Sequence, residues 1–114
     1  PSELVHLAEK TKLEEGKTTS FKQGNYIGKH IWFPDFEIFS IKAKSGVHKK
    51  FDPRFHGNTA EVCVVLSGRL ILTVAGESNE LGPGMAYRFK ALLDHHFDVI
   101  EAAEFLLIHH NITA

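Results

Sequence analysis

The stretch Glu61-Val-Cys-Val-Val-Leu66, followed by Ser67-Gly68 and then by Arg69-Leu-Ile-Leu-Thr-Val74, decides the fold of this chain. Its first run is almost entirely apolar, which is typical of a strand covered on both faces. Ser67-Gly68 is a tight-turn signal, so we expect the second run to return as the antiparallel partner strand. The polar residues from Gly76 to Asn79 are expected to close this hairpin.

Short β-type runs, separated by turn signals, continue on both sides of this hairpin. Ser2–Glu15 is the only candidate helix, and Leu4-Val5-His6-Leu7 within it fits a short edge strand equally well. A chain of roughly eight or nine short strands predicts an all-β antiparallel sandwich or barrel. The other expected strands span 25–33, 36–42, 85–89, 95–100 and 104–110.

Length and composition limit the classes of protein that need to be considered. The chain has 114 residues and no linker or internal repeat, so we expect a single domain over 1–114 with residues 1–16 as an N-terminal arm. Its 13 basic and 14 acidic residues give a net charge of −1, which argues against nucleic acid as a partner. No apolar run approaches the roughly 18 residues of a membrane span. The single cysteine and the lack of a signal-peptide pattern predict a cytoplasmic protein.

The spacing of three residues points to a family. His56 stands five residues before Glu61, and Glu61 stands seven before Gly68, so that the chain reads H-x4-E-x6-G. In this it resembles the cupins, whose first motif ends in the same way. Gly84 and His95 keep the glycine-to-histidine distance of the second cupin motif. The resemblance covers residues 36–110 and implies a cupin-type double-stranded β-helix, a jelly-roll barrel.

The chain departs from the cupin motifs at several positions. Arg54 stands where the first motif usually has its first histidine, and a guanidinium has no lone pair to give to a metal. His48 replaces the leading glycine of that motif. The second motif is weaker, because the residues at its proline, second glycine and asparagine positions are Lys90, Leu92 and Val99.

Strand parity gives an independent indication of what faces the interior. If Glu61 points inward, so do Cys63 and Val65. In the later strand His95 shares the more apolar face with Phe97 and Val99, whereas His96, Asp98 and Ile100 share the other face. A carboxylate on an inward apolar face needs a charged or hydrogen-bonding partner.

The resemblance implies that this partner is a divalent metal ion. The predicted ligands are His56, Glu61 and His95, a two-histidine, one-carboxylate set that leaves coordination positions open. Fe(II) is the first expectation, followed by Mn, Ni and Zn. His48 and His96 are reserve ligands. An alternative without metal is a buried ion pair between Glu61 and Arg54.

Two further residues are candidates for catalytic roles. Arg54 fits a clamp for a substrate carboxylate or phosphate, and a solvated position at the rim fits it equally well. Tyr87 shares parity with Met85 and Phe89 and is a candidate acid, with packing as the simpler role. Cys63 lies among valines, where an inert buried thiol is expected.

Three functions follow as expectations. The first is a metal-dependent enzyme of the oxygenase or isomerase type, acting on a small and anionic organic substrate. The second is a non-catalytic module that binds a sugar or small effector. The third is a metal-free sugar isomerase or epimerase, with His56 as base and Tyr87 as acid. The aromatic cluster at residues 32–39 is expected to pack one sheet, with coverage of a dimer seam by part of it as the alternative. A homodimer is also expected, because the small cupins that the chain resembles commonly pair through such sheets.

Overall fold

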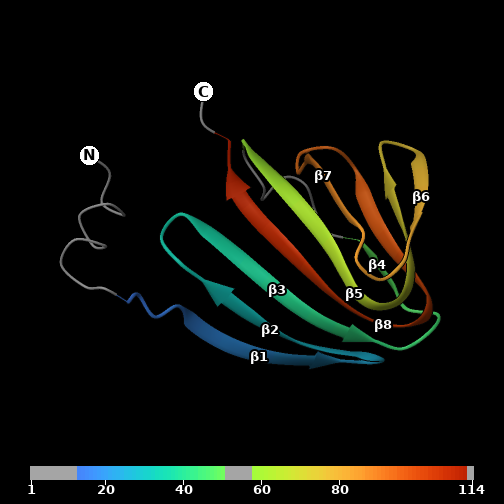
Figure 1. Ribbon diagram of the computed structural model, residues 1–114, viewed down its shortest axis with the longest axis horizontal. Helices are drawn as coiled ribbons and strands as arrows, with labels where there is room; N and C mark the ends of the chain where they lie inside the picture. Colours follow the sequence, from blue (N-terminus) through green and yellow to red (C-terminus); the bar gives the residue numbers. More distant parts are fainter. Residues whose placement is uncertain (1–12, 51–57, 113–114) are drawn as a thin grey trace.

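The chain folds into antiparallel strands, as a computed structural model of residues 13–50 and 58–112 shows (Figure 1). None of these residues is helical. The strands are β1 (Lys17–Gln23), β2 (Tyr26–Trp32), β3 (Phe36–Ala43), β4 (His48–Lys50), β5 (Thr59–Val74), β6 (Glu77–Leu81), β7 (Ala86–Lys90) and β8 (His95–Asn111).

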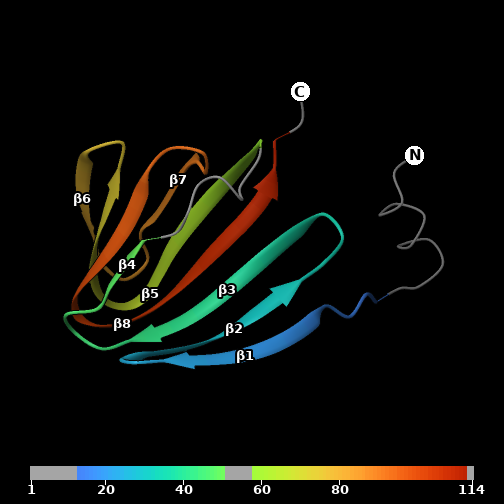
Figure 2. The same cartoon turned by 180° about the vertical axis from the view of Figure 1, so that it is seen from behind.

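The two longest strands, β5 and β8, pair along most of their length and belong to both layers of the fold. The first half of β5 and the second half of β8 lie in a large layer with β1, β2, β3 and β7. Their other halves form a smaller layer with β4 and β6. The sheet therefore curls over on itself, as the two opposite views show (Figures 1 and 2). This arrangement confirms the expected all-β cupin-type jelly roll.

The predicted hairpin at Ser67-Gly68 is wrong, because β5 continues without a turn through these residues. Gly68 has a φ of 77° and lies where the β5–β8 register is irregular. A Cβ atom on Gly68 would collide with the carbonyl oxygen of Ala102 and lie 2.6 Å from Cα of Ala103. The glycine therefore lets β5 bend closely past β8 instead of reversing the chain.

The predicted break in the last strand is absent for the same reason. Residues 101–103 were expected to separate two strands, but β8 is continuous and bends opposite Gly68. Of the predicted strands, 25–33, 36–42 and 85–89 are confirmed as β2, β3 and β7. The polar stretch 76–79 is only partly a turn, since β6 begins at Glu77.

The core lies between the two layers and consists of inward side chains that alternate along the strands. The parity prediction is confirmed: Glu61, Cys63 and Val65 on β5 are buried, as are His95 and Phe97 on β8. Large apolar side chains that are fully buried each contribute roughly 1.5–3 kcal/mol. The other buried apolar residues are Ile41, Ala43, Ala60, Leu70, Leu72, Leu81, Ala91, Val99, Ala103, Phe105 and Leu107.

Candidate functional site

Two polar side chains face each other inside the barrel. Glu61 comes from the half of β5 that lies in the large layer, and His95 begins β8 in the small layer. Their exposed fractions are 4% and 0%, and His95 Nε2 lies 3.6 Å from Glu61 Oε1. Residues 34 positions apart in the sequence are thus brought together across the interior by the curl of the sheet.

The His95 ring is held in one orientation. Its Nδ1 donates a hydrogen bond of 2.7 Å to the carbonyl oxygen of Leu93, so that Nε2 is directed toward Glu61. The ring of Phe89 lies 4.8 Å away between centroids, and Phe97 meets it edge-on at 6.3 Å. A fixed Nδ1–H leaves the Nε2 lone pair of a neutral imidazole available as a ligand.

The buried Glu61 carboxylate and the His95 imidazole form an environment that favours a bound cation. Burial lowers the pKa of His95 and is the largest single influence, but the hydrogen bonds to Glu61 and to Leu93, with the nearby carboxylates, outweigh it and leave that pKa raised. A proton or a metal ion between imidazole and carboxylate satisfies both groups. The donor set, one imidazole nitrogen and one carboxylate, therefore fits a divalent transition metal.

Several residues predicted for this site are not among those that the structure describes. Arg54 and His56 lie in residues 51–57, between β4 and β5, outside the described ranges. Their roles as clamp and ligand stay predictions. Tyr87 lies on β7 in register with Cys63 and has an exposed side chain.

Cys63 is fully buried two residues beyond Glu61. Burial, and secondarily the Glu61 carboxylate, raise the pKa of its thiol from 9.0 to about 12. The thiol is therefore protonated at neutral pH, in agreement with the expected inert role.

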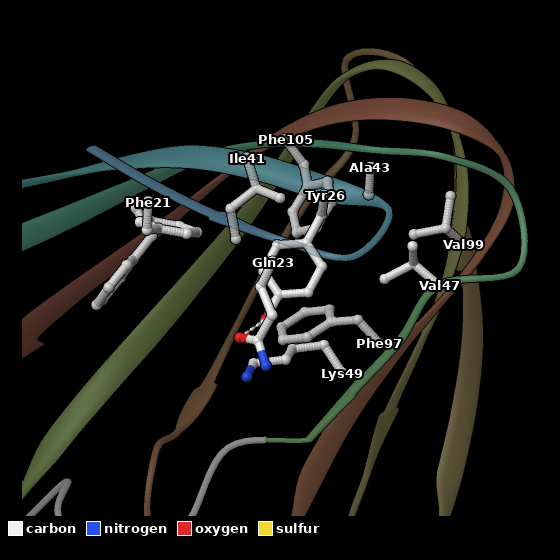
Figure 3. Close-up of a pocket in the computed structure, with 11 residues that line it drawn as sticks. Phe21, Gln23, Tyr26, Ile41, Ala43, Val47, Lys49, Phe97, Val99 and Phe105 are labelled. Atoms are coloured by element: carbon white, nitrogen blue, oxygen red, sulfur yellow. Dashed lines mark hydrogen bonds between the residues drawn. The ribbon is translucent and has the colours of Figure 1, made fainter.

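A cavity of about 220 Å³ opens further along the interior (Figure 3). Most of its wall is apolar, and Phe97, which also touches His95, belongs to it. Lys49 contributes the positive charge, with its Nζ 5.6 Å from the centre of the Tyr26 ring. The hydroxyl of Tyr26 donates a hydrogen bond of 2.8 Å to Gln23. The cavity combines an apolar wall with a cationic and polar rim.

Sequence reasoning missed these rim residues. Lys49 alternates with its neighbours on β4, so parity with Val47 would have marked it as inward. Gln23 and Tyr26 come from the ends of β1 and β2, and no pattern in the sequence links them to residues 47–49.

The reserve ligand His96 lies on the opposite face of β8 from His95, and the reserve ligand His48 lies on the neighbouring β4 in register with Asp98. With Asp98 they form a separate group whose potential ligand atoms are all within 4.8 Å of one another. Asp98 was not among the predicted ligands, although its shared parity with His96 is readable from the sequence. The structure thus brings Glu61 and His95 together and places His48 and His96 in a second group.

The curled antiparallel sheet, with Glu61 and His95 buried inside it, places the chain among the small antiparallel β-barrels. The family model described as the cupin domain matches residues 44–109, which span β4 to most of β8. The chain belongs to the cupin domain family.

Solved structures agree with this assignment. The cupin domain of an XRE-family transcriptional regulator from Enterobacter cloacae is 26% identical, with a TM-score of 0.69 over 79% of this chain and 100% of that one. KdgF from Halomonas sp. is 16% identical, with a TM-score of 0.69 over 88% of each chain. Ectoine synthase from P. lautus is 15% identical, with a TM-score of 0.66 over 82% of this chain and 70% of that one.

No curated protein matches the sequence. Within the residues that the structure describes, no helix is long and apolar enough to cross a membrane.

Proposed function

We propose that this cupin domain binds one divalent transition metal ion inside its barrel and a small organic anion beside it. The observation that carries the proposal is the buried Glu61–His95 pair, whose 3.6 Å separation joins the two layers of the fold. His56 is proposed as the third ligand because of its motif spacing. Fe, Mn, Ni and Zn are the candidate ions.

The residues around the pair have separate roles in this proposal. Glu61 supplies the negative charge that offsets part of the charge of the ion. The Leu93 carbonyl holds His95 in the tautomer with a free Nε2 lone pair. The rings of Phe89 and Phe97 exclude water from the imidazole. When bound, the metal supplies a Lewis acid with open positions for a ligand.

The cavity supports a small anion with an apolar body as the ligand. Its wall accommodates the apolar part, and the Lys49 ammonium at the rim offers a charge-assisted hydrogen bond to a carboxylate. Arg54 is proposed as a second cationic contact. Tyr87 is proposed as a hydrogen-bond donor to the same ligand.

Enzymatic turnover is our first candidate function, and a specific observation supports a second. The cupin domain of the transcriptional regulator is fully covered by the match and is the most similar in sequence of the three structures above. This likeness favours a domain that binds an effector without changing it. Both candidates share the same metal and anion site.

Metal content tests the inner site. The chain, purified without an affinity tag and stripped with chelator, is offered Fe(II) under anaerobic conditions, Mn, Ni or Zn, and the bound metal is counted. We expect at least one equivalent, with one equivalent lost in Glu61→Gln, His95→Gln and His56→Gln. His110→Gln is the matched control, since the His110 ring donates its hydrogen bond to the carbonyl oxygen of the neighbouring Asn111 and lies outside both proposed ligand sets. Full metal content in Glu61→Gln and His95→Gln variants that remain folded would contradict the proposed ligands.

Two neighbouring lysines test the anion site. Lys49 lines the cavity, whereas Lys50 is in register with His96 on the outer face. In a thermal-shift panel of small carboxylates, we expect Lys49→Gln to lower affinity at least tenfold and Lys50→Gln to leave it unchanged. Equal losses in both variants, or no stabilising carboxylate, would contradict the anion site. Conversion of the bound acid by metal-loaded protein then selects the enzyme, and unchanged acid selects the binding module.

A further inference from the structure

A second set of metal-binding side chains lies on the outer face of the small layer. His48 comes from β4, and His96 and Asp98 come from β8, two residues apart and therefore on the same face. His95, between Asp94 and His96 in the chain, points to the opposite face and is buried. The outer group is thus separated from the inner pair by the strand itself.

The geometry of the group is set by the pairing of β4 with β8. His48 is directly opposite Asp98 in register, and its Nδ1 lies 2.6 Å from Asp98 Oδ1. His96 Nε2 lies 3.5 Å from the other oxygen, Asp98 Oδ2. The two imidazole rings are 5.0 Å apart between centroids. Asp98 therefore sits between the two histidines and presents one oxygen to each.

We propose that His48, His96 and Asp98 bind a divalent transition metal ion of the Zn²⁺ type. Two imidazoles and one carboxylate are ligands that zinc accepts, and three protein ligands leave a fourth position for water. Zinc–ligand distances of about 2.0–2.1 Å place tetrahedral ligand atoms roughly 3.3 Å apart. The present ligand atoms, within 4.8 Å of one another, reach this spacing by small side-chain rotations.

The environment permits both the rotations and the entry of an ion. The exposed fractions of the His48, Asp98 and His96 side chains are 57%, 43% and 32%, so none is locked by packing. On binding, the ion would take the place of the hydrogen atom between His48 Nδ1 and Asp98 Oδ1, and a neutral His48 ring would then carry its proton on Nε2. Lys50, in register with His96, places a positive charge on the same face and moderates the affinity.

The site is tested by zinc titration of the chelator-stripped chain, followed through the ring nitrogen signals of its eight histidines by NMR. We expect saturable shifts of the His48 and His96 rings. Asp98→Asn and His48→Gln are expected to weaken this transition at least tenfold, and His110→Gln to leave it unchanged. Both outer-face variants alter exposed side chains, and thermal unfolding confirms that they are folded.

The possible results separate this site from the inner one. Zinc that shifts only the His95 ring, or an outer transition of unchanged affinity in Asp98→Asn, overturns the outer site. Failure of the inner site instead appears as a metal-insensitive His95 ring and an unaltered titration in Glu61→Gln. Retention of the His48 and His96 shifts in folded Glu61→Gln supports an outer site that is independent of the inner pair.

Discussion

At the start of strand β8, two consecutive histidines lie on opposite faces of the sheet and in different environments. His95 on the inner face is fully buried and its ring is fixed by the Leu93 carbonyl. His96, the next residue, is partly exposed, and its Nε2 lies 3.5 Å from Oδ2 of Asp98 on the outer face of the same strand. Alternation of side chains along a strand thus gives adjacent histidines different chemistry.

The two groups differ in how firmly the protein fixes the positions of their side chains before a metal ion binds. The inner pair is surrounded by Phe89 and Phe97 and joins two layers of the sheet, so its geometry is held by the core. The outer group is positioned by backbone register and by contacts between its own partly exposed side chains, so the core does not fix its geometry. Preorganised ligands favour tight and selective binding, whereas adjustable ones favour weaker binding of a wider range of ions.

The largest effect is expected where the inner face is packed. Phe97 is 1% exposed and touches His95, Phe105 and the cavity, so Phe97→Ala should lower the free energy of unfolding by about 3–5 kcal/mol. Ile100→Ala removes a side chain of the same strand that is 41% exposed, and its effect should stay within about 1 kcal/mol. Urea unfolding measures both, and equal losses would contradict the assignment of faces.

The next effect concerns the point where both long strands bend between layers. Gly68→Ala combines a left-handed φ of 77° with a collision against the backbone of β8, and should cost at least about 2 kcal/mol. Gly76 is a control with a similar φ of 84° and open space around its Cα, so Gly76→Ala should cost only about 1 kcal/mol. A smaller loss for Gly68→Ala than for Gly76→Ala in urea unfolding would show that the bend tolerates a side chain.

Strand parity was readable from the sequence because it depends only on neighbours two residues apart. Alternation placed Glu61, Cys63 and Val65 on one common face, and the more apolar character of its face selected His95 as the inward histidine. The course of β5 through Gly68 did not, since a glycine with positive φ is compatible with a turn and with a bulge. The choice between them depends on the backbone of Ala102, which lies 34 residues further along the chain.

The features missed in the sequence have two physical causes. Strand β1 is mostly polar and exposed, so it carries no alternation that marks a strand. The cavity gathers side chains from five strands, and the outer metal group depends on the register between His48 and Asp98. Register over 50 residues is a property of the folded sheet, and short-range spacing does not contain it.

A third and smaller effect follows from the thiol on the inner face. The native pKa of Cys63 is raised to about 12, whereas the unfolded thiol ionises near 9.0. Its contribution to stability is therefore constant below pH 9 and is lost as the pH rises from 9 toward 12. Between pH 8 and pH 10, the free energy of unfolding of the native sequence should fall by about 1 kcal/mol more than that of the Cys63→Ala variant.

Urea unfolding at the two pH values measures this difference, and alkylation provides a second readout. Iodoacetamide should leave native Cys63 unmodified at pH 8 and modify it in urea, because only the exposed thiolate reacts. Identical pH dependence in both proteins, or rapid alkylation of the native chain, would show that the inner face admits solvent.

The smallest effect is expected from the outer carboxylate in the absence of metal. Asp98 is 43% exposed in its side chain, so its ion pair with His48 is screened by water, and Asp98→Asn should cost less than about 1 kcal/mol in chelator. Glu61→Gln makes the same chemical change at a buried position and should cost several times more free energy of unfolding, because it removes the charged partner of a buried imidazole.

The salt dependence of unfolding distinguishes the two carboxylates further. Raising the ionic strength should reduce the loss of unfolding free energy in Asp98→Asn toward zero and leave the loss in Glu61→Gln nearly constant. Salt screens exposed charges and has little effect on charges in the core. Equal salt sensitivity in urea unfolding would mean that the two carboxylates share one environment, against the separation of faces on which both proposed metal sites depend.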